Sequence, residues 1–364
     1  MKKGVVDLPG SGWFRQWFQV SALYVGTVIG AGFASGQEIM QFFIIFGEKG
    51  LWGVTMATLL FGVLGFLLMA FTTAVRCSSY MELLPLLMGH RLARLVDWLS
   101  LAMLPGGLVV MLAGSGALFH EQFGLPTEAG TLLAGLITSL VILGGLEGVL
   151  LSNMILVPVK VCIIALVCLL AVIHHGGWPE ITQAGQPLTG TDRHWLWSSV
   201  LYVSYNMVVP LAVLSSLGRR VDQRPGALGG LTGGIALGTT AVLVTLAGLI
   251  FYPQITHYQV PLLCIAGCLG EGWRHGLGIL IWLAILTTAI ADAHGFASRL
   301  APGGGMTYRL VGLGTILISL PLARMDFTRL VQLLYPLFGY AGLMIMAGLL
   351  ITPFRLKLIL RDWK

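Results

Sequence analysis

The chain has 364 residues, of which 56% are hydrophobic and only 10% are charged, and its mean hydropathy is +0.88. Soluble domains carry about 25% charged residues, so this composition excludes a mainly soluble protein and predicts an all-α polytopic membrane protein. The formal net charge of +6 is attributed to membrane topology and not to nucleic-acid binding. The five cysteines show no CxxC pattern and no metal-ligand spacing.

Apolar runs of about 20 residues, the length a helix needs to cross a bilayer, predict ten transmembrane helices. They cover residues 17–45, 50–75, 92–118, 129–149, 152–174, 195–217, 227–252, 274–299, 305–323 and 329–353. The expected segments are a cytoplasmic N-terminal segment (1–16), a first five-helix repeat (17–174), an extracytoplasmic connecting loop (175–194), a second five-helix repeat (195–353) and a cytoplasmic C-terminal tail (354–364).

The first span is interrupted. Four glycines fall within the eleven residues 26–36, and the acidic residue Glu38 follows. Each glycine makes a helix interior less favourable by about 1 kcal/mol relative to alanine. In hydrocarbon, an unwound backbone survives only where it is buried in protein or lines a cavity. The stretch therefore predicts a broken helix 1 and a substrate site near the membrane midplane, as in secondary transporters.

Three pairs of features at similar offsets predict an internal repeat. Pro85-Leu86-Leu87 and Pro261-Leu262-Leu263 lie 176 positions apart, Pro158 and Pro336 lie 178 apart, and the interrupted stretch near residue 30 precedes a polar segment near residue 205 by about the same number. With the N-terminus in the cytoplasm, fifteen lysines and arginines lie inside and five outside, the usual bias. The two Pro-Leu-Leu segments then lie on opposite sides of the membrane. This predicts a five-plus-five inverted repeat with both termini cytoplasmic, and chance similarity among Leu-rich segments is the alternative.

The sixth span contains polar side chains and a proline in its middle. Ser204 and Asn206 lie between Tyr202 and Pro210. A proline lacks the N–H that would bond the carbonyl one turn back. The segment therefore predicts a broken helix 6, opposite the first interruption.

Lys160 lies eight positions into the fifth span, roughly 12 Å along a helix. A cation at that depth costs several kcal/mol unless it is paired or neutral. Two interpretations are open. Burial disfavours the charged form, so Lys160 can exchange a proton during a functional cycle, or it can be a permanent strut on the carbonyls of the broken helix. The functional interpretation is favoured because ionisable groups inside the membrane are functional by default.

Other polar residues in the spans have more than one interpretation. Thr287 and Thr288 can complete a Na⁺ cage with freed carbonyls, but bonding to their own helix carbonyl is favoured from spacing alone. Glu38 is a proton site, faces a vestibule, or caps the outer half-helix of span 1. Asp292 is expected to pair with His294 or Arg299, or to reach water. In span 10, Gln332, Tyr335 and Tyr340 line an outer pathway or are interfacial residues.

The sequence Gly26-x-x-Ile29-Gly30-Ala31-Gly32-Phe33 resembles the first-helix motif of the amino acid–polyamine–organocation (APC) superfamily of transporters, which has the leucine-transporter (LeuT) fold. The longer string over residues 26–39 is similar to the YkvI-like membrane proteins, a bacterial branch. The ten-span layout extends the resemblance over nearly the whole chain, and it implies a location in the bacterial cytoplasmic membrane.

The resemblance implies roles for individual positions. The substrate-binding positions are Gly30, Ala31 and Gly32 for a substrate carboxylate, Tyr205 as an aromatic gate, and Tyr202, Ser204 and Asn206 beside it. The positions that match a Na⁺ site are Gly26, Ile29, Ala284, Thr287 and Thr288. Proton-coupled members instead place a lysine of the fifth helix at this ion site, and Lys160 matches that lysine. Asn153, seven residues earlier, resembles the Asn–Lys spacing of those members.

The chain thus carries the marks of both coupling types. A lysine ammonium and Na⁺ repel each other in a low dielectric, so Lys160 is expected to be the resident cation, with Thr288 among its acceptors. Neutral Lys160 beside bound Na⁺ is the alternative. Asn206 stands where amino-acid and cation transporters of the superfamily often have an acid, so the substrate type is not carried over strictly.

The expected function is ion-coupled secondary transport of a small amino-acid-like solute by alternating access, with proton coupling favoured over Na⁺. The alternatives are a ligand sensor like the spore-germination permease subunits, a Na⁺-coupled symporter and a passive channel. The partners expected are the solute and the lipid bilayer, and no nucleic acid. The sequence contains no HExxH, GxSxG or P-loop motif, so no enzyme activity is predicted. No cofactor is expected beyond the coupling ion. The sequence predicts no oligomeric state.

Overall fold

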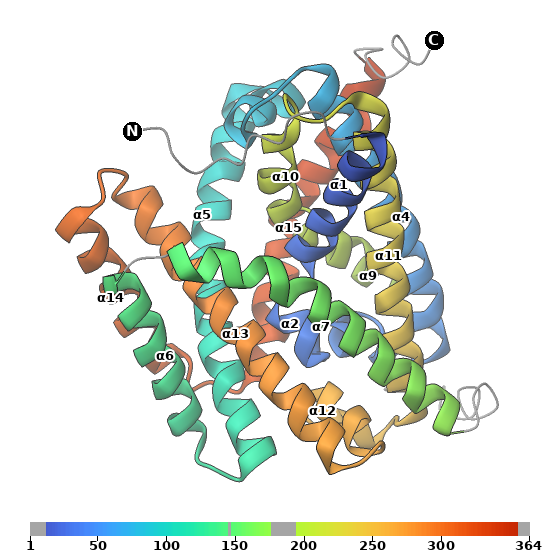
Figure 1. The fold of residues 1–364 in the computed structure, drawn as a ribbon, viewed down its shortest axis with the longest axis vertical. Coiled ribbons are helices and arrows are strands. Elements are labelled where there is room, and N and C mark those ends of the chain that lie inside the picture. The colour runs from blue at the N-terminus through green and yellow to red at the C-terminus, as the bar shows by residue number, and fades with distance from the viewer. Residues whose placement is uncertain (1–11, 145–146, 176–193, 356–364) are drawn as a thin grey trace.

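The computed structural model describes residues 12–144, 147–175 and 194–355, and the side chains of 147–157 and 352–355 are outside that description. The described chain is helical, without strands (Figure 1). The first half contains α1 (Trp13–Val28), α2 (Ala31–Ser35), α3 (Gln37–Phe42), η1 (Ile44–Phe46), α4 (Glu48–Ala74), α5 (Tyr80–Phe123), α6 (Thr127–Gly144) and α7 (Glu147–His174). The second half contains α9 (Trp195–Asn206), α10 (Val208–Leu214), η2 (Ser215–Leu217), α11 (Gln223–Ile250), η3 (Gln254–His257), α12 (Pro261–Gly267), α13 (Glu271–Leu300), α14 (Gly305–Leu322) and α15 (Phe327–Arg355).

Eight helices of the described part are long and apolar enough to cross a membrane. Two shorter apolar helices, Gln37–Phe46 and Pro158–His174, lie where spans 1 and 5 were expected. The structure is therefore that of a multi-pass membrane protein, while the count of ten spans stays a prediction. The connecting loop and the two terminal segments lie largely outside the described residues.

The second half of the chain repeats the order of elements in the first. In both halves a short helix precedes a long one, and a glycine with positive φ separates them, Gly89 (φ 77°) within α5 and Gly270 (φ 116°) before α13. Only glycine adopts such backbone angles readily. The start of α5 and the helix α12 lie at opposite ends of the molecule (Figure 1). This placement agrees with an inverted relation between the two Pro-Leu-Leu segments.

The first span is interrupted where the glycines predict it. Helix α1 ends at Val28, Gly30 is extended (φ −85°, ψ −166°), and α2 begins at Ala31. A second turn follows at Gly36 (φ 82°), where the backbone and side chain of Leu262 on α12 come within 3.0 to 3.2 Å of the position a Cβ would take. A residue with a side chain would meet both an unfavourable φ and this contact.

The sixth span departs from its expectation, because its interruption is confined to one residue. Met207 separates α9 from α10 but keeps right-handed helical angles (φ −83°, ψ −12°), and its N–H still bonds Val203 O at 3.0 Å. Pro210 falls in the first turn of α10, where a missing N–H is tolerated. The unwinding expected for helix 6 is thus absent at Met207.

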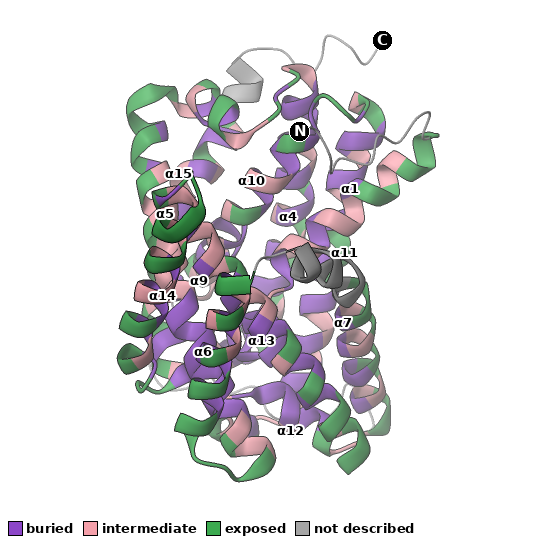
Figure 2. Ribbon diagram, turned by 60° about the vertical axis from the view of Figure 1, so that its left-hand side comes forward, coloured by how far each residue is buried: buried purple, intermediate pink, exposed green. Residues whose placement is uncertain are grey.

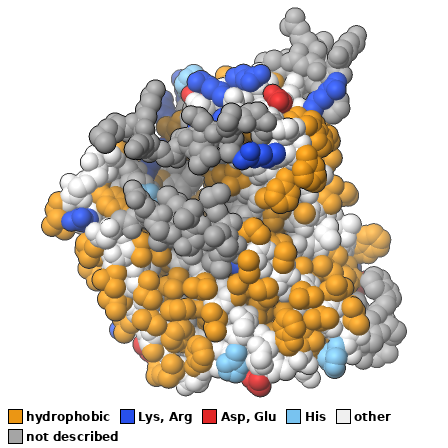
Figure 3. All heavy atoms as spheres, viewed as in Figure 1, with side chains coloured by type: hydrophobic (Ala, Val, Ile, Leu, Met, Phe, Trp, Pro, Cys, Tyr) orange, Lys and Arg blue, Asp and Glu red, His pale blue; other side chains and the backbone are white. Residues whose placement is uncertain are grey.

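The arrangement of side chains suits a bilayer. Buried residues gather toward the middle of the bundle and exposed ones lie on its outer helices (Figure 2), where many are large and apolar, for example Leu136, Leu317 and Leu337. Lysine and arginine side chains gather at the end where α1 begins and α15 ends, shown at the top of Figures 1 and 3. This is the end that the charge bias assigns to the cytoplasm.

Candidate functional site

Lys160 on α7 reaches the interruption between α1 and α2. Its Nζ donates to the carbonyl oxygen of Ile29 at 3.3 Å, and the residue is only 2% exposed. An uninterrupted helix would use that carbonyl for the N–H four residues later. The extended backbone at Gly30 instead turns it to the lysine. The side chain of Asn153 lies outside the described residues.

Thr287 and Thr288 on α13 lie beside the same interruption. Both hydroxyls donate to Ala284 O on their own helix, at 3.0 and 2.9 Å, which confirms the alternative favoured from spacing. The Thr288 oxygen is 3.9 Å from the Cβ position of Gly30, so α13 does face the interruption. Within the described residues, Lys160 donates to Ile29 and not to Thr288, contrary to the expectation that Thr288 accepts from it.

The positions assigned to a Na⁺ site lie on two sides of this interruption. Gly26 is on α1, Ile29 in the interrupted stretch, and Ala284 with the two threonines on α13. The Ile29 and Ala284 carbonyls accept from the lysine and the threonines. Their assignment to an ion stays a prediction.

The α-carbon of Gly32 is covered by the protein itself. A Cβ at this position would lie 2.6 Å from the Tyr335 hydroxyl, and even closer to the carboxylate of Glu38. Gly32 therefore lies next to an acidic side chain, and Gly30 and Ala31 directly precede Gly32 in the chain. Their predicted role in holding a substrate carboxylate stays a prediction.

Glu38, in the first turn of α3, is 5% exposed. It therefore does not face water in this structure, and its place in the first turn of α3 agrees with the interpretation of an acid near a helix N-terminus. The hydroxyls of Tyr205 and Tyr335 approach its carboxylate. The proton-site hypothesis for Glu38 stays a prediction.

The four residues assigned on α9 divide into two pairs. Tyr202 packs edge-on against Phe43, and Tyr205 lies on Tyr335, with ring centroids 4.8 and 5.1 Å apart. Both tyrosines lie near Glu38. The other two side chains, those of Ser204 and Asn206, donate to backbone carbonyls of helices. Ser204 Oγ donates to Gly339 O on α15 at 2.7 Å, and Asn206 donates to Tyr202 O at 3.0 Å.

Tyr335 and Asp292 were not assigned to the substrate site from the sequence, but both lie near it. Tyr335 contacts Tyr205, and Asp292 lies near Tyr335. Asp292 packs on Gly107 of α5, where a Cβ would lie 2.5 Å from its carboxylate. The expected pairings of Asp292 are wrong, because His294 bonds the Tyr308 hydroxyl at 2.8 Å and Arg299 is bound by Asp97 and Tyr80. One feature of the sequence could have drawn attention to Tyr335. It directly precedes Pro336, which pairs with Pro158 in the predicted internal repeat.

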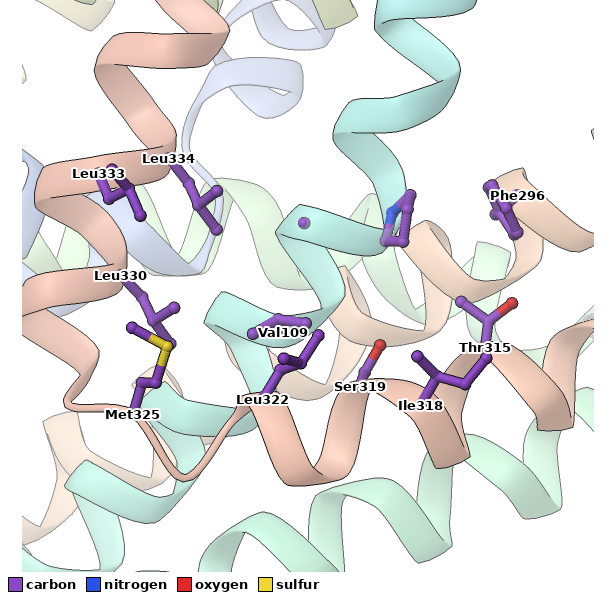
Figure 4. Close-up of a pocket in the computed structure, with 12 residues that line it drawn as sticks. Val109, Phe296, Thr315, Ile318, Ser319, Leu322, Met325, Leu330, Leu333 and Leu334 are labelled. Carbon is purple, nitrogen blue, oxygen red and sulfur yellow. The ribbon is translucent and has the colours of Figure 1, made fainter.

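A separate pocket of about 430 Å³ lies among α5, α13, α14 and α15 (Figure 4). Apart from the hydroxyls of Thr315 and Ser319, its labelled side chains are apolar. None of the predicted site residues lines it. The candidate site is therefore the region around the interrupted span and not this pocket.

Comparison with solved structures defines the class of fold. The chain aligns with the manganese transporter of Eremococcus coleocola at a TM-score of 0.60 and 16% identity, covering 98% of this chain and 81% of that one. It aligns with the inward-facing conformation of Mhp1 at 0.57 and 13% identity, covering 91% and 75%. The fold is thus shared with LeuT-fold transporters, and neither structure is an enzyme.

Comparison with curated sequences identifies similar proteins over nearly the full length. The chain is 28% identical to the uncharacterized membrane protein YkvI of Bacillus subtilis over 333 residues, covering 91% of this chain and 94% of that protein. It is 29% identical to the uncharacterized protein YyaD of the same organism over 354 residues, covering 94% and 97%. No family model matches the chain. These comparisons confirm the resemblance to YkvI-like membrane proteins with a transporter fold.

Proposed function

We propose that the chain is a secondary active transporter that moves a small amino-acid-like solute across the bacterial cytoplasmic membrane by alternating access, coupled to protons through Lys160. One observation carries the proposal. A buried lysine donates to the Ile29 carbonyl, at the backbone interruption where α1, α2 and α13 meet. The shared transporter fold supports the same class.

Protonation of Lys160 gives it a means to couple an ion gradient to a conformational change. The charged ammonium makes a stronger hydrogen bond to Ile29 O than a neutral amine does. Loss of the proton therefore weakens the tie between α7 and the interrupted span. A ligand or proton that binds two arrangements with different affinity shifts their populations. In this proposal, α1, α4, α9 and α11 rock against α5, α6, α13 and α14.

Uptake into proteoliposomes tests the proposal. A thermal-shift screen of amino acids and amines, with and without Na⁺ and at two pH values, first selects the solutes. We expect an imposed proton gradient to drive their accumulation, and Lys160→Ala to abolish it while solute binding persists. Lys49→Ala changes an exposed lysine on α4 and is the matched control, expected to transport normally. Full gradient-driven uptake by Lys160→Ala would refute the lysine assignment.

Na⁺ coupling is the second candidate, supported by the Thr288 oxygen that faces Gly30. An ion there would compete with Lys160 for the Ile29 carbonyl. Uptake that follows an imposed Na⁺ gradient and ignores the proton gradient would select it. Binding without accumulation would indicate a sensor, and flux that no gradient drives uphill would indicate a channel.

A further inference from the structure

The cluster around Gly32 contains buried polar atoms that lack a hydrogen bond of good geometry, although the Tyr205 hydroxyl approaches the Glu38 carboxylate. Within the described residues, Glu38 Oε2 and the hydroxyls of Tyr202 and Tyr205 have no hydrogen-bond partner of good geometry. Buried polar groups are nearly always partnered, and an exception needs an explanation. Glu38 and Tyr202 are 5% and 0% exposed, so bulk water does not supply the partner in this arrangement.

Aromatic rings from three elements pack against one another beside Glu38. Tyr202 and Tyr205 of α9 have centroids 5.9 Å apart, and Phe42 of α3 lies 5.4 and 5.9 Å from them. Tyr335 of α15 continues the set at 5.1 Å from Tyr205. Ring faces attract cations electrostatically, and cages of several rings recognise ammonium groups.

The local charge also favours a cation. A second acidic side chain, Asp292 of α13, lies near Tyr335. In the described part of the chain, neither Glu38 nor Asp292 forms an ion pair with a basic side chain. The buried lysine of this region, Lys160, donates to Ile29 O instead. A cation that enters the cluster would therefore meet a carboxyl group without a counter-ion, and its positive charge would favour the ionised carboxylate.

We propose that the Glu38–tyrosine cluster, defined as Glu38, Tyr202, Tyr205 and Tyr335, binds the ammonium group of an organic cation, so that the transported solute is an amine and a carboxylate on it is not required. The Glu38 carboxylate accepts hydrogen bonds from the ammonium N–H groups, and the aromatic rings cover the remaining faces of the ammonium group. This inference rests on the proposed function, because a transporter cycle supplies the opening through which a solute reaches a site that is closed here.

A metal ion fits this cluster less well than an ammonium group. The described residues contain no group of three or more His, Cys, Asp or Glu side chains that could hold a metal. Mn²⁺ and related ions prefer several carboxylate, carbonyl or water oxygens in octahedral geometry. The cluster offers one carboxylate and aromatic walls.

Thermal unfolding of the purified full chain in detergent tests the proposal with three small probes at equal ionic strength. The probes are butylammonium chloride, sodium butyrate and manganese chloride. We expect butylammonium to raise the melting temperature in a concentration-dependent way, while butyrate and Mn²⁺ do not. Glu38→Gln should abolish the butylammonium shift. Glu128→Gln alters an exposed acid on α6 and should keep it. Tyr205→Leu, which removes a ring but no charge, should weaken it.

Several outcomes would overturn the proposal. They are a shift by butyrate or Mn²⁺ without one by butylammonium, a butylammonium shift that persists in Glu38→Gln, and no butylammonium shift in the folded wild type, which would leave water as the partner of these atoms. Uptake assays separate this failure from failure of the proposed function. Ammonium binding without accumulation refutes transport and keeps the binding group, whereas uptake of an anionic solute keeps transport and refutes the binding group.

Discussion

The interface between α4 and α11 and the Glu38–tyrosine cluster are both buried, but they are built in opposite ways. At the interface, Gly65 and Gly230 bring two backbones so close that a Cβ on either would lie 2.4 or 2.2 Å from the other's carbonyl oxygen. Small residues allow such close packing between membrane helices. The cluster instead buries one oxygen of Glu38 and two tyrosine hydroxyls that have no hydrogen bond of good geometry among the described residues. Close fit stabilises the first region, while the second gives up stability, as binding sites commonly do.

The largest expected effect comes from filling the glycine interface. Gly230→Leu puts a side chain where the carbonyl of Gly65 lies, and helix α11 has to move away from α4. Overpacking costs about 1–3 kcal/mol in adaptable cores, and backbone atoms adapt less than side chains. We expect loss of monodisperse, folded protein in detergent, measured by fluorescence-detected size-exclusion chromatography.

Gly314→Leu is the matched control for this prediction. Gly314 lies on α14, and its Cβ position has nothing within 4 Å. The same substitution there should leave the elution profile unchanged. Equal behaviour of the two variants would contradict the argument that backbone contact sets the geometry of α4 and α11.

The two regions also differ in how well the sequence predicts them. Runs of glycine and apolar residues indicated the spans and the interruption at Gly30, because these are properties of one segment. The cluster joins side chains from α3, α9 and α15, and no local pattern indicates which faces meet. Thr288 shows the benefit of a local rule, since its bond to Ala284 O followed from spacing. Pro210 shows its limit, because a proline early in a helix does not unwind it.

A smaller effect is expected where α9 meets α15. Ser204 Oγ donates to Gly339 O at 2.7 Å, and Ser204→Ala removes that bond between helices. A hydrogen bond contributes about 1 kcal/mol, so the melting temperature should fall by a few degrees. Ser139→Ala is the control, because among the described residues Ser139 bonds only the Gly135 carbonyl of its own helix. A larger loss in Ser139→Ala would show that Ser204 does not link the two helices.

The smallest expected effect is that of Glu38→Gln on the protein without solute. The glutamine keeps the shape of the side chain and removes a carboxylate that has an unpartnered oxygen, so little native stabilisation is lost. We expect the free energy of unfolding to stay within about 1 kcal/mol of the wild type or to rise, measured by thermal unfolding without added amine. A fall of several degrees would show that the carboxylate holds α2, α3 and α15 together. In that case the contacts of the cluster would stabilise the fold, as those of the glycine interface do, and would not be kept for binding.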